Sequence, residues 1–514
     1  MLRKIIHPLK IFLFICSASF ILAGCATSKP RPVDAKGCNV ILVIIDDLRP
    51  DHLGCYGYKR KVSAAIDAIA ADSVVFDNAF SQAPYTLPST ISILTSLYPS
   101  SHGMFLIYKD KLSKRVQTIA EIFSAYQYRT AWFSLLKTPH LDVDIGFGRG
   151  FQDKVELGIE FEGRQELLYW IEKNRKHKFF LAMDIRRVHD FFRFIRTSSK
   201  HKAGHAVAEQ GSSSGDVERD FYLKIVKLAL EKKTPFNDPA LVSGHRDLFN
   251  GIYSAEKVDQ IKQLFPEGKR QQLDNIRDGL FSAWVRSEAG KDIQSWINAY
   301  DETVSTTDRE LIKPLLRELK RLGLYDKTLI IITADHGEAF GEHNEYGHNS
   351  LVYEVNHVPL IIKMPYASKP WRTKELAQGV DIMPTALDLA GIAIPHQAQG
   401  KSLSGLLRQS NTNGPNEYVF EQGRNKSSIR SKEWRLIVPN MEKRKKGIKH
   451  LYHLSVDPHE RNNLYYFEQK IASKMQNELD RWQGSLVSYK DKEYEFSPEI
   501  DRLTRERIRE TGYW

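Results

Sequence analysis

Four short runs of apolar, mostly β-branched residues constrain the fold of this chain more than any other feature. They cover residues 39–45 (NVILVII), 179–183, 328–333 (TLIIIT) and 358–363. Continuous runs of this kind are typical of strands buried on both faces of a parallel sheet, and helical patterns lie between them. The sequence therefore predicts an α/β fold, a doubly wound and mostly parallel sheet flanked by helices.

The clearest predicted helix precedes the third of these runs. Its apolar side chains fall on one face and comprise Leu311, Ile312, Leu315, Leu316, Leu319 and Leu322. Gly323 supplies a stop at the C-terminal end. Pro314 lies inside the pattern, so it either kinks this helix or marks its true start.

The composition changes twice along the chain. Residues 198–216 are polar and rich in Ser, Gly and His, which is typical of a surface insertion. After Gly400, short strand-like pieces (YVFEQ, WRLIV, HLYHL) precede a final helix. We therefore expect a large α/β domain over residues 39–400 and a smaller C-terminal α+β subdomain over residues 401–514.

The first 24 residues have the pattern of a secretion signal. A basic start (MLRKIIHPLK) precedes an apolar run that is too short to span a bilayer comfortably. The run ends in LAGC, which resembles the lipobox of bacterial lipoproteins, so Cys25 is the expected lipidation site and residues 25–38 the polar tether. An ordinary cleaved signal with an incidental cysteine is the alternative. The resemblance implies a lipid-anchored protein of the bacterial cell envelope, and Ala26 after the cysteine favours the outer membrane.

The chain is basic, with a formal net charge of +11. Such a charge attracts anionic substrates or lipid head groups, although basic residues scattered over solvated faces would give the same total. No nucleic-acid-binding motif accompanies the charge, so no nucleic-acid partner is expected. Outside the signal and the lipobox only Cys38 and Cys55 remain. The extended run after Cys38 carries the chain away from it, so we expect both thiols to be unpaired.

Two acidic pairs follow predicted strands. Asp46-Asp47 closes the first run, and Asp335-His336 comes shortly after the third. Ligands of open α/β sheets bind beyond the carboxyl ends of the strands, where both pairs should lie. Carboxylates suit calcium, magnesium or manganese, and the imidazole admits zinc. Either pair alone would equally suit a helix N-cap or a surface turn. Together they favour a divalent metal site.

A third candidate is Thr86 in the segment APYTLPST. It stands where a helix is expected to begin, with Pro88 in the first turn. An oxygen nucleophile at this place gains from the positive end of the helix dipole and from a nearby metal, since both favour the alkoxide. The alternative is that Thr86 only caps the helix.

These segments together resemble the sulfatase family of the alkaline phosphatase superfamily. IIDDLRPDHLGCYGY resembles its first metal-binding stretch, TLPSTISILTSLYPSSHG the signature around its nucleophile, and LGLYDKTLIIITADHGEAFGEHNEYGH its second metal-binding stretch. VPLIIKMP, VDIMPTALDLAGI and LYHLSVDPHERNNL are similar to later segments. The matches follow the family order over residues 39–485. The resemblance implies a metal-dependent hydrolase of sulfate or phosphate esters whose substrate is an anionic ester, for example an envelope glycan or lipid.

The resemblance also implies roles for single residues. Asp46, Asp47, Asp335 and His336 become metal ligands, and Thr86 takes the nucleophile position with its oxygen facing the metal.

Four further residues lie at or near substrate-side positions of the family. His189 resembles the histidine near the leaving group and is the expected general acid, although RRVHDFF lacks the family's usual proline. His348 matches a contact to a substrate oxygen, and Lys137 and His140 lie in the segment that supplies another. Each of these four could instead be a solvated surface residue.

The match departs from the family at the nucleophile itself. Sulfatases carry cysteine or serine there and oxidise it to an aldehyde, whereas the methyl group of Thr86 allows only a ketone. Thr90 replaces the family's arginine. An unmodified threonine can still attack phosphorus, as in alkaline phosphatase-like enzymes and phosphoglycerol transferases, so a phosphoester is the favoured substrate. A phosphoglycerol-type transferase and a catalytically inactive binding lipoprotein of the envelope are the alternatives.

Overall fold

The computed structural model describes most of the chain outside its ends and one long internal segment. The described residues are 36–105, 110–134, 145–146, 148–157, 161–189, 191, 292–366, 370–408, 413–440 and 447–491. The expected signal peptide, Cys25, most of the tether, the insertion at 198–216, Lys137 and His140 lie outside them, so the expectations for these parts stay predictions.

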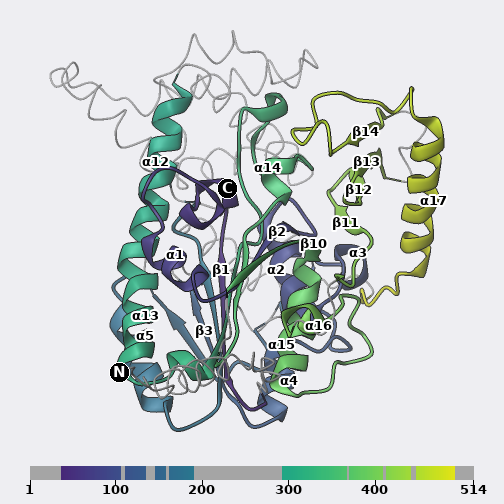
Figure 1. Ribbon diagram of the computed structural model, residues 1–514. Coiled ribbons are helices and arrows are strands. Elements are labelled where there is room, and N and C mark those ends of the chain that lie inside the picture. Colours follow the sequence, from purple (N-terminus) through teal and green to yellow (C-terminus); the bar gives the residue numbers. More distant parts are fainter. Residues whose placement is uncertain are drawn as a thin grey trace, which may run out of the picture.

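An eight-stranded sheet forms the centre of the molecule (Figure 1). Across the sheet the strands are β10 (Trp371–Gln378), β2 (Val74–Phe80), β9 (Leu360–Lys363), β6 (Thr328–Thr333), β1 (Asn39–Ile45), β5 (Phe179–Ile185), β3 (Arg129–Ser134) and β4 (Asp153–Glu156). β1 lies in parallel between β5 and β6, and all seven of its residues are buried. The four apolar runs of the sequence thus become four of these strands.

The strand direction confirms the mostly parallel sheet, with one exception among the described strands. β9 runs antiparallel to both β2 and β6. It also begins at Leu360, two residues later than the apolar run 358–363 suggests. Pro359 has no backbone N–H to give to a neighbouring strand, which explains the later start.

Helices cover both faces of this sheet (Figure 1). One group packs together on one side and consists of α1 (Ala64–Ala70), α5 (Arg164–Asn174), α12 (Ile293–Thr307) and α13 (Lys313–Arg321). The other consists of α2 (Thr86–Thr95), α3 (Pro99–His102), α4 (Ile119–Ala125), α15 (Ile382–Ala390) and α16 (Ser404–Leu407). The short α14 (Tyr353–Asn356) lies between β8 and β9 in the chain. This is the doubly wound arrangement that the sequence predicts.

The helix predicted before β6 is longer than its apolar pattern indicates. α12 continues through a π-helical turn (Asp308–Ile312) into α13, and Pro314 occupies the first turn of α13. Pro314 therefore marks the start of α13, which is the second of the two alternatives that the sequence left open. Gly323 follows the helix with φ +63°, a backbone conformation that favours glycine.

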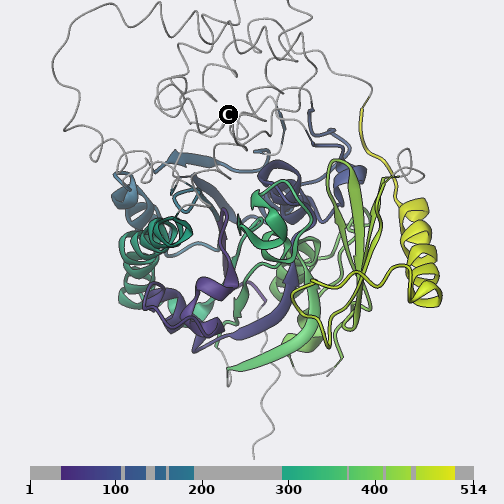
Figure 2. The same cartoon turned by 90° about the horizontal axis from the view of Figure 1, so that it is seen from above.

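A second sheet forms the C-terminal part and stands beside the large sheet, with α17 on its outer side (Figure 2). Its antiparallel strands are β11 (Val419–Gln422), β12 (Lys426–Arg430), β13 (Trp434–Pro439) and β14 (His450–His453), and α17 spans Gln469–Ser485. Ala472, Met475 and Leu479 of α17 pack on the apolar face of this sheet. The expected α+β character is confirmed, while β12 (KSSIR) is a strand that the sequence pattern did not reveal.

The remaining short elements connect these parts. A two-stranded ladder joins β7 (Ala339–Phe340) to β8 (Tyr346–Gly347), and 3₁₀ turns lie at Pro50–His52, Gly54–Tyr56, Tyr325–Lys327, Glu342–Asn344 and Gly379–Asp381. Cys38 and Cys55 are both free thiols, as expected. Within the described part of the chain, no helix is both long enough and apolar enough to cross a membrane.

Candidate active site

The candidate residues gather at the carboxyl edge of the large sheet. Asp46 and Asp47 follow β1, His336 follows β6, and His189 follows β5. These three strands are adjacent and parallel, so their carboxyl ends meet at one edge. β2 ends at the same edge, and the loop after it leads into α2, which begins with Thr86.

The innermost group consists of two carboxylates, an imidazole and a hydroxyl. Oγ1 of Thr86 lies 3.1 Å from Nε2 of His336 and 3.5 Å from Oδ1 of Asp46. The same Nε2 lies 3.4 Å from Oδ1 of Asp46 and 3.6 Å from Oδ2 of Asp335. All four side chains are buried. The structure thus brings together four of the five residues predicted around a metal, and Asp47 adjoins them through His336.

The donor set of this inner group fits a divalent cation. Nδ1 of His336 lies 3.0 Å from the carbonyl oxygen of Gly337, which can only accept a hydrogen bond, so Nδ1 carries the proton of the neutral imidazole. Nε2, which faces Asp46 and Asp335, is then the nitrogen that can bind a cation. Oδ2 of Asp335 is buried and accepts no hydrogen bond from the described residues. Ligands about 2.0–2.5 Å from one ion and at right angles lie roughly 3–3.5 Å apart, close to the spacings found. Among the residues that the structure describes, Asp46, Asp335 and His336 also form one of two groups of possible metal ligands whose ligand atoms lie within 4.8 Å of one another.

The start of α2 places Thr86 within this group. Tyr85 before it is extended (φ −164°, ψ 159°), and Pro88 in the first turn needs no partner for a backbone N–H. The hydroxyl of Ser89 donates a hydrogen bond to the backbone oxygen of Asp335 and thereby ties the helix to the loop after β6. Thr86 therefore stands at the positive end of a ten-residue helix, where negative charge on its oxygen is favoured.

Asp47 is held in an unusual backbone conformation. Its φ of 61° lies in the left-handed region, which costs a residue other than glycine about 1–2 kcal/mol. The hydroxyl of Tyr300 donates to the backbone oxygen of Asp47 at 2.8 Å and accepts the N–H of Arg49 at 2.8 Å. This bridge fixes the turn after β1 and aims the side chain of Asp47 toward the histidines.

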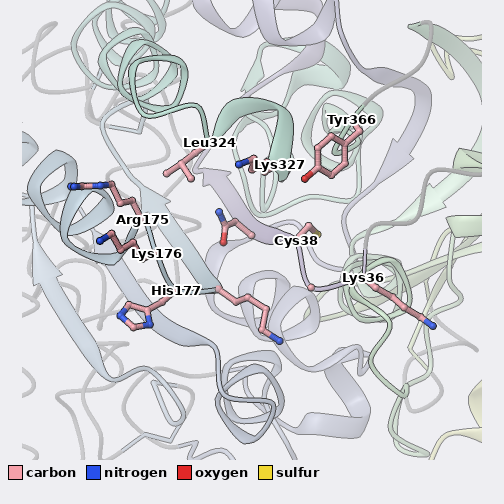
Figure 3. Close-up of a pocket in the computed structure, with 11 residues that line it drawn as sticks. Lys36, Cys38, Arg175, Lys176, His177, Leu324, Lys327 and Tyr366 are labelled. Atoms are coloured by element: carbon pink, nitrogen blue, oxygen red, sulfur yellow. The ribbon is translucent and has the colours of Figure 1, made fainter.

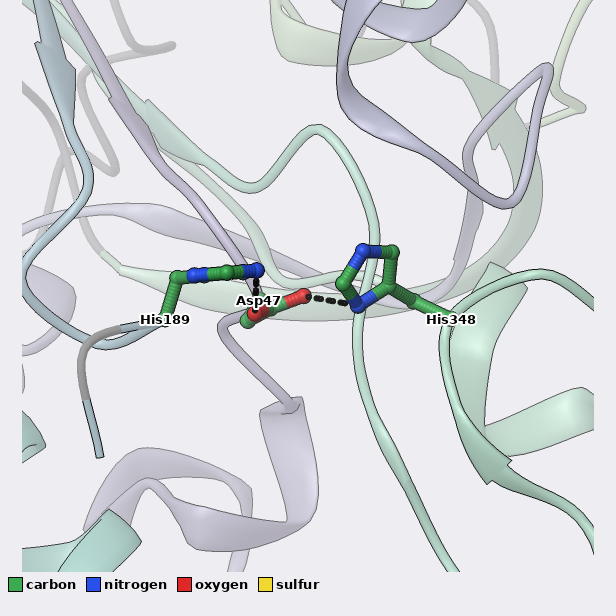
Figure 4. A group of neighbouring side chains, drawn as sticks. All are labelled: Asp47, His189 and His348. Carbon is green, nitrogen blue, oxygen red and sulfur yellow. Dashed lines mark ion pairs between the residues drawn. The ribbon is translucent and has the colours of Figure 1, made fainter. Parts of the chain in front are cut away.

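A second group surrounds Asp47 (Figure 4). Its Oδ1 lies 3.0 Å from Nδ1 of His336 and 3.5 Å from Nδ1 of His348, and its Oδ2 lies 3.9 Å from Nε2 of His189. Nδ1 of His348 is also 2.8 Å from Oε2 of Glu338. His189 and His348, predicted on the substrate side, therefore both adjoin Asp47, and their predicted roles in proton transfer and substrate contact stay predictions.

The pKa values of the carboxyl groups show how strongly this region favours a positive charge. Burial raises the pKa of Asp47 to about 7 and that of Glu338 to about 8. Burial and the charge of Asp46 raise the pKa of Asp335 well above its ordinary value. A neighbouring cation would stabilise the ionised forms of all these groups.

The histidines divide into two kinds. Burial lowers the pKa of His336, but Asp335 and Asp47 outweigh it and raise this pKa well above its usual range. Burial lowers the pKa of His189 to about 3 and also lowers that of His348. His189 and His348 are therefore neutral imidazoles at pH 7, the form that binds metals. The carboxylates that favour a proton on His336 equally favour a cation beside it.

Several residues near the site have no counterpart among the sequence predictions. Glu338 follows His336 by two residues, so the motif DHGE carried a signal for it. Tyr300 carried none, because it reaches the site from α12. Arg424, in the turn between β11 and β12, lies with its guanidinium 5.1 Å from the ring centre of Tyr85, the neighbour of Thr86. The C-terminal subdomain thus brings a positive charge close to the N-terminal end of α2.

Two other features lie at or beyond the limits of the site. Thr90, at the position of the family's arginine, is buried, and its hydroxyl has no hydrogen-bond partner among the described residues. A cavity of about 240 Å³ lies at the opposite edge of the sheet, where its lining includes Cys38, Lys178 and Lys327 beside the amino ends of β1, β5 and β6 (Figure 3). Because the strands point away from it, this cavity is not part of the candidate active site.

Comparison with known families agrees with the geometry of this edge. The family model described as sulfatase matches residues 38–392, and the one described as N-sulphoglucosamine sulphohydrolase, C-terminal, matches residues 341–485. The first match spans more than half of the chain. The protein therefore belongs to the sulfatase family, a class of enzymes that hydrolyse ester bonds.

Individual relatives are similar over nearly the whole chain. The N-acetylglucosamine-6-O-sulfatase of Bacteroides thetaiotaomicron is 24% identical over 92% of this chain and 90% of its own. A solved structure with the substrate D-glucosamine-2-N,6-O-disulfate has a TM-score of 0.58 and 18% identity, and covers 87% of this chain and 97% of that one. The phosphonate monoester hydrolase of Agrobacterium radiobacter has a TM-score of 0.63 and 17% identity, and covers 88% and 96%. The structural matches support the fold class.

Proposed function

We propose that this sulfatase-family enzyme cleaves phosphate-type esters with Thr86 as the nucleophile and a divalent cation held by Asp46, Asp335 and His336. The observation that carries the proposal is the place of the Thr86 hydroxyl, 3.1 Å from His336 Nε2 and 3.5 Å from Asp46 Oδ1 at the start of α2. A hydroxyl that only capped the helix would have no need of this surrounding ligand set.

The proposed reaction proceeds in two displacements. Thr86 loses its hydroxyl proton to solvent, Oγ1 bonds to phosphorus, the bond from phosphorus to the alcohol oxygen breaks, and that oxygen takes a proton from water. Water then adds to phosphorus and displaces Oγ1, which releases phosphate and restores the hydroxyl. An acceptor alcohol in place of water would make the same enzyme a transferase.

The surroundings of Thr86 supply what this chemistry needs. When bound, the cation adds a positive charge that favours the alkoxide and neutralises the transferred group. The N-terminus of α2 favours the same negative charge. Arg424 adds a further cation near Tyr85, suited to an anionic substrate.

The side chain of Thr86 argues for phosphorus over sulfur. A threonine cannot become the aldehyde whose hydrate expels sulfate in family members with cysteine or serine. A sulfothreonine would lack that route, whereas a phosphothreonine can be resolved by water. The structural likeness to a phosphonate monoester hydrolase is consistent with a phosphorus substrate.

Hydrolysis of a sulfate ester is the second candidate. It is favoured by the family itself and by the similarity to an N-acetylglucosamine-6-O-sulfatase over nearly the whole chain. Under this reading the substrate would be a sulfated sugar.

The test compares full-length protein, purified in detergent and supplied with Ca²⁺, Mg²⁺, Mn²⁺ or Zn²⁺, on an aryl phosphate, an aryl phosphodiester and an aryl sulfate. We expect phosphoester cleavage that falls by about 10³-fold or more in Thr86→Ala, is partly retained in Thr86→Ser and is unchanged in the control Thr306→Ala on α12. Sulfate cleavage that survives in Thr86→Ala would contradict both the substrate and the nucleophile.

A further inference from the structure

We propose that the cavity at the amino edge of the large sheet binds phosphate head groups and thereby docks the domain on an anionic lipid surface. The cavity lies beside the first residues of β1, at the edge opposite the candidate active site. Neither Thr86 nor the metal ligands take part in this docking. It gives the enzyme a side that faces the membrane and its active site a direction.

The lining of the cavity is strongly basic. Its 11 lining residues include five cations and a histidine, but no aspartate or glutamate (Figure 3). The cations are Lys36, Arg175, Lys176, Lys178 and Lys327. They precede β1, β5 and β6, three adjacent parallel strands whose starts bring the three segments together. Such a concentration of one sign of charge attracts anions.

Three of these cations have no carboxylate partner. Arg175 pairs with Glu172 at 3.6 Å. Lys176, Lys178 and Lys327 are exposed, and none of them forms an ion pair with an acidic residue of the described part of the chain. The cavity therefore carries a net positive charge that a bound anion would compensate.

The size of the cavity and the type of cation favour a surface of head groups over an enclosed small molecule. Its volume of about 240 Å³ is below the roughly 300–1,000 Å³ of pockets that bury a drug-sized ligand. Lysine is a flexible point charge that binds phosphate without the fixed two-point geometry of arginine. Exposed lysines of this kind bind the surface of anionic membranes.

An exposed aromatic ring adjoins these lysines. Tyr366 lines the cavity, and 60% of its surface is exposed. Its backbone N–H donates a hydrogen bond to the backbone oxygen of Asp326 at 2.6 Å, which ties it to the turn that carries Lys327. Tyrosine is enriched where a membrane meets water, because its ring is apolar and its hydroxyl is polar. A tyrosine beside several lysines thus suits contact with lipid head groups.

The chain enters the domain at this cavity. Lys36 is the first described residue and lines the cavity, and β1 begins three residues later at Asn39. Only residues 26–35 separate Lys36 from Cys25, the expected lipidation site, and such a stretch spans at most about 40 Å when fully extended. An anchor at Cys25 would therefore keep the cavity near the membrane and raise the effective concentration of head groups beside it.

Docking at this edge directs the active site away from the membrane. β1 runs from Asn39 beside the cavity to Ile45, and Asp46 of the candidate metal site follows it. A strand of this length separates the two edges by about 20 Å. The active site then opens to the aqueous side, so its substrate is a soluble or peripheral anionic ester and not a lipid of the same membrane surface.

Amide hydrogen exchange of the full-length protein tests the docking. The protein is mixed with phosphatidylcholine vesicles that either contain or lack phosphatidylglycerol, and exchange is followed by mass spectrometry. We expect residues 171–180 and 321–328 to be protected only by the vesicles with phosphatidylglycerol. Residues 342–349, beside the active site, should exchange equally with both. High salt should remove the protection, because it screens the charges of exposed lysines.

The variant Lys176→Gln/Lys327→Gln should weaken the docking. The degree of protection reports the equilibrium between the docked and the undocked domain, and each substitution should lower this equilibrium about fivefold. The control Lys470→Gln/Lys474→Gln removes two exposed lysines of α17 that do not line the cavity, and it should leave the protection unchanged.

Three other outcomes would overturn the docking. The first is equal exchange with both kinds of vesicle, and the second is protection that persists in Lys176→Gln/Lys327→Gln. The third is the same protection by glycerol phosphate or inorganic phosphate without vesicles, which would make the cavity a site for a free phosphate compound. Each of these outcomes leaves the proposal for Thr86 untouched, because no step of the experiment depends on ester cleavage.

Discussion

Single residues at the site combine strain, burial and charge. Asp47 adopts a left-handed backbone conformation, and Tyr300 stabilises this conformation through hydrogen bonds on both sides of the turn. The sequence indicated the aspartate, because it follows a buried strand. It did not indicate the tyrosine, which is 253 residues away along the chain. A residue that acts on a neighbour in space, such as Tyr300, leaves no recognisable pattern in the sequence around it. A residue at the end of a buried strand, such as Asp47, follows a recognisable apolar run.

Tyr300 is expected to be a positioning residue. Tyr300→Phe keeps the ring but leaves the buried carbonyl of Asp47 and the N–H of Arg49 without this partner, at a cost of about 1–3 kcal/mol in the free energy of unfolding. The turn would relax, and metal affinity and kcat should fall together, while Tyr169→Phe on the exposed face of α5 changes neither. Urea unfolding and metal titration measure both effects. A destabilised Tyr300→Phe with wild-type metal affinity would show that the hydroxyl serves stability alone.

At the scale of elements, strand ends were more predictable than strand directions. β1 and β6 coincide with their apolar runs, since continuous β-branched residues fit only a strand buried on both faces. The direction of β9 could not be predicted from the sequence, because an antiparallel strand buried on both faces has the same composition as a parallel one. β12 was missed because KSSIR has little apolar content, although its side chains are largely buried.

The C-terminal sheet contains its own buried network. Glu460, after β14, pairs with Arg430 at 2.5 Å and with Arg435 at 2.6 Å, and Arg435 also pairs with Glu421 at 2.6 Å. All four side chains are at least 96% buried. Such a network fixes the relative register of three strands, because no one member can move without leaving a charge unpaired.

Removing the charge of Glu460 should therefore destabilise this subdomain in a pH-dependent way. Burial raises the pKa of Glu460, but Arg435 and Arg430 outweigh it and hold the pKa below its ordinary value. The stabilisation is present above the unfolded-state pKa of about 4.3 and is lost as the pH falls through the folded-state pKa. Glu460→Gln should cost roughly 3–5 kcal/mol near pH 7 and much less at low pH.

Urea unfolding at both pH values measures this effect, and Glu478→Gln is the matched control, since its Arg481 partner is exposed. A cost for Glu460→Gln that stays constant with pH would mean that packing, and not charge, holds the network together.

At the scale of the whole molecule, the topology explains why widely separated residues meet. The sheet directs the carboxyl ends of β1, β2, β5 and β6 to one edge, and the C-terminal sheet stands beside it (Figure 2). Gln422 of β11 donates its backbone N–H to Gln82 in the loop that leads to α2, and its side-chain oxygen accepts the N–H of Ser100. The second sheet thereby supports the loop that leads to Thr86 and places Arg424 beside Tyr85.

The predictable and unpredictable parts of the site follow from this topology. The grouping of Asp46, Asp335, His336 and Thr86 could be predicted, since each stands just after a strand or at a helix start. The resemblance gave Asp47, His189 and His348 as site residues, but their arrangement around one carboxylate depends on side-chain directions in loops, which no periodicity encodes.

A search for the covalent intermediate tests most directly whether Thr86 attacks the ester. Full-length enzyme is mixed with excess aryl phosphate, quenched in acid and digested, and the peptide that contains Thr86 is sequenced by mass spectrometry. We predict a phosphoryl group on Thr86 that is absent without metal and absent from Thr86→Ala. An active enzyme with an unmodified Thr86 in the same rapid-quench samples, or a phosphoryl group on another residue, would show that Thr86 is not the nucleophile.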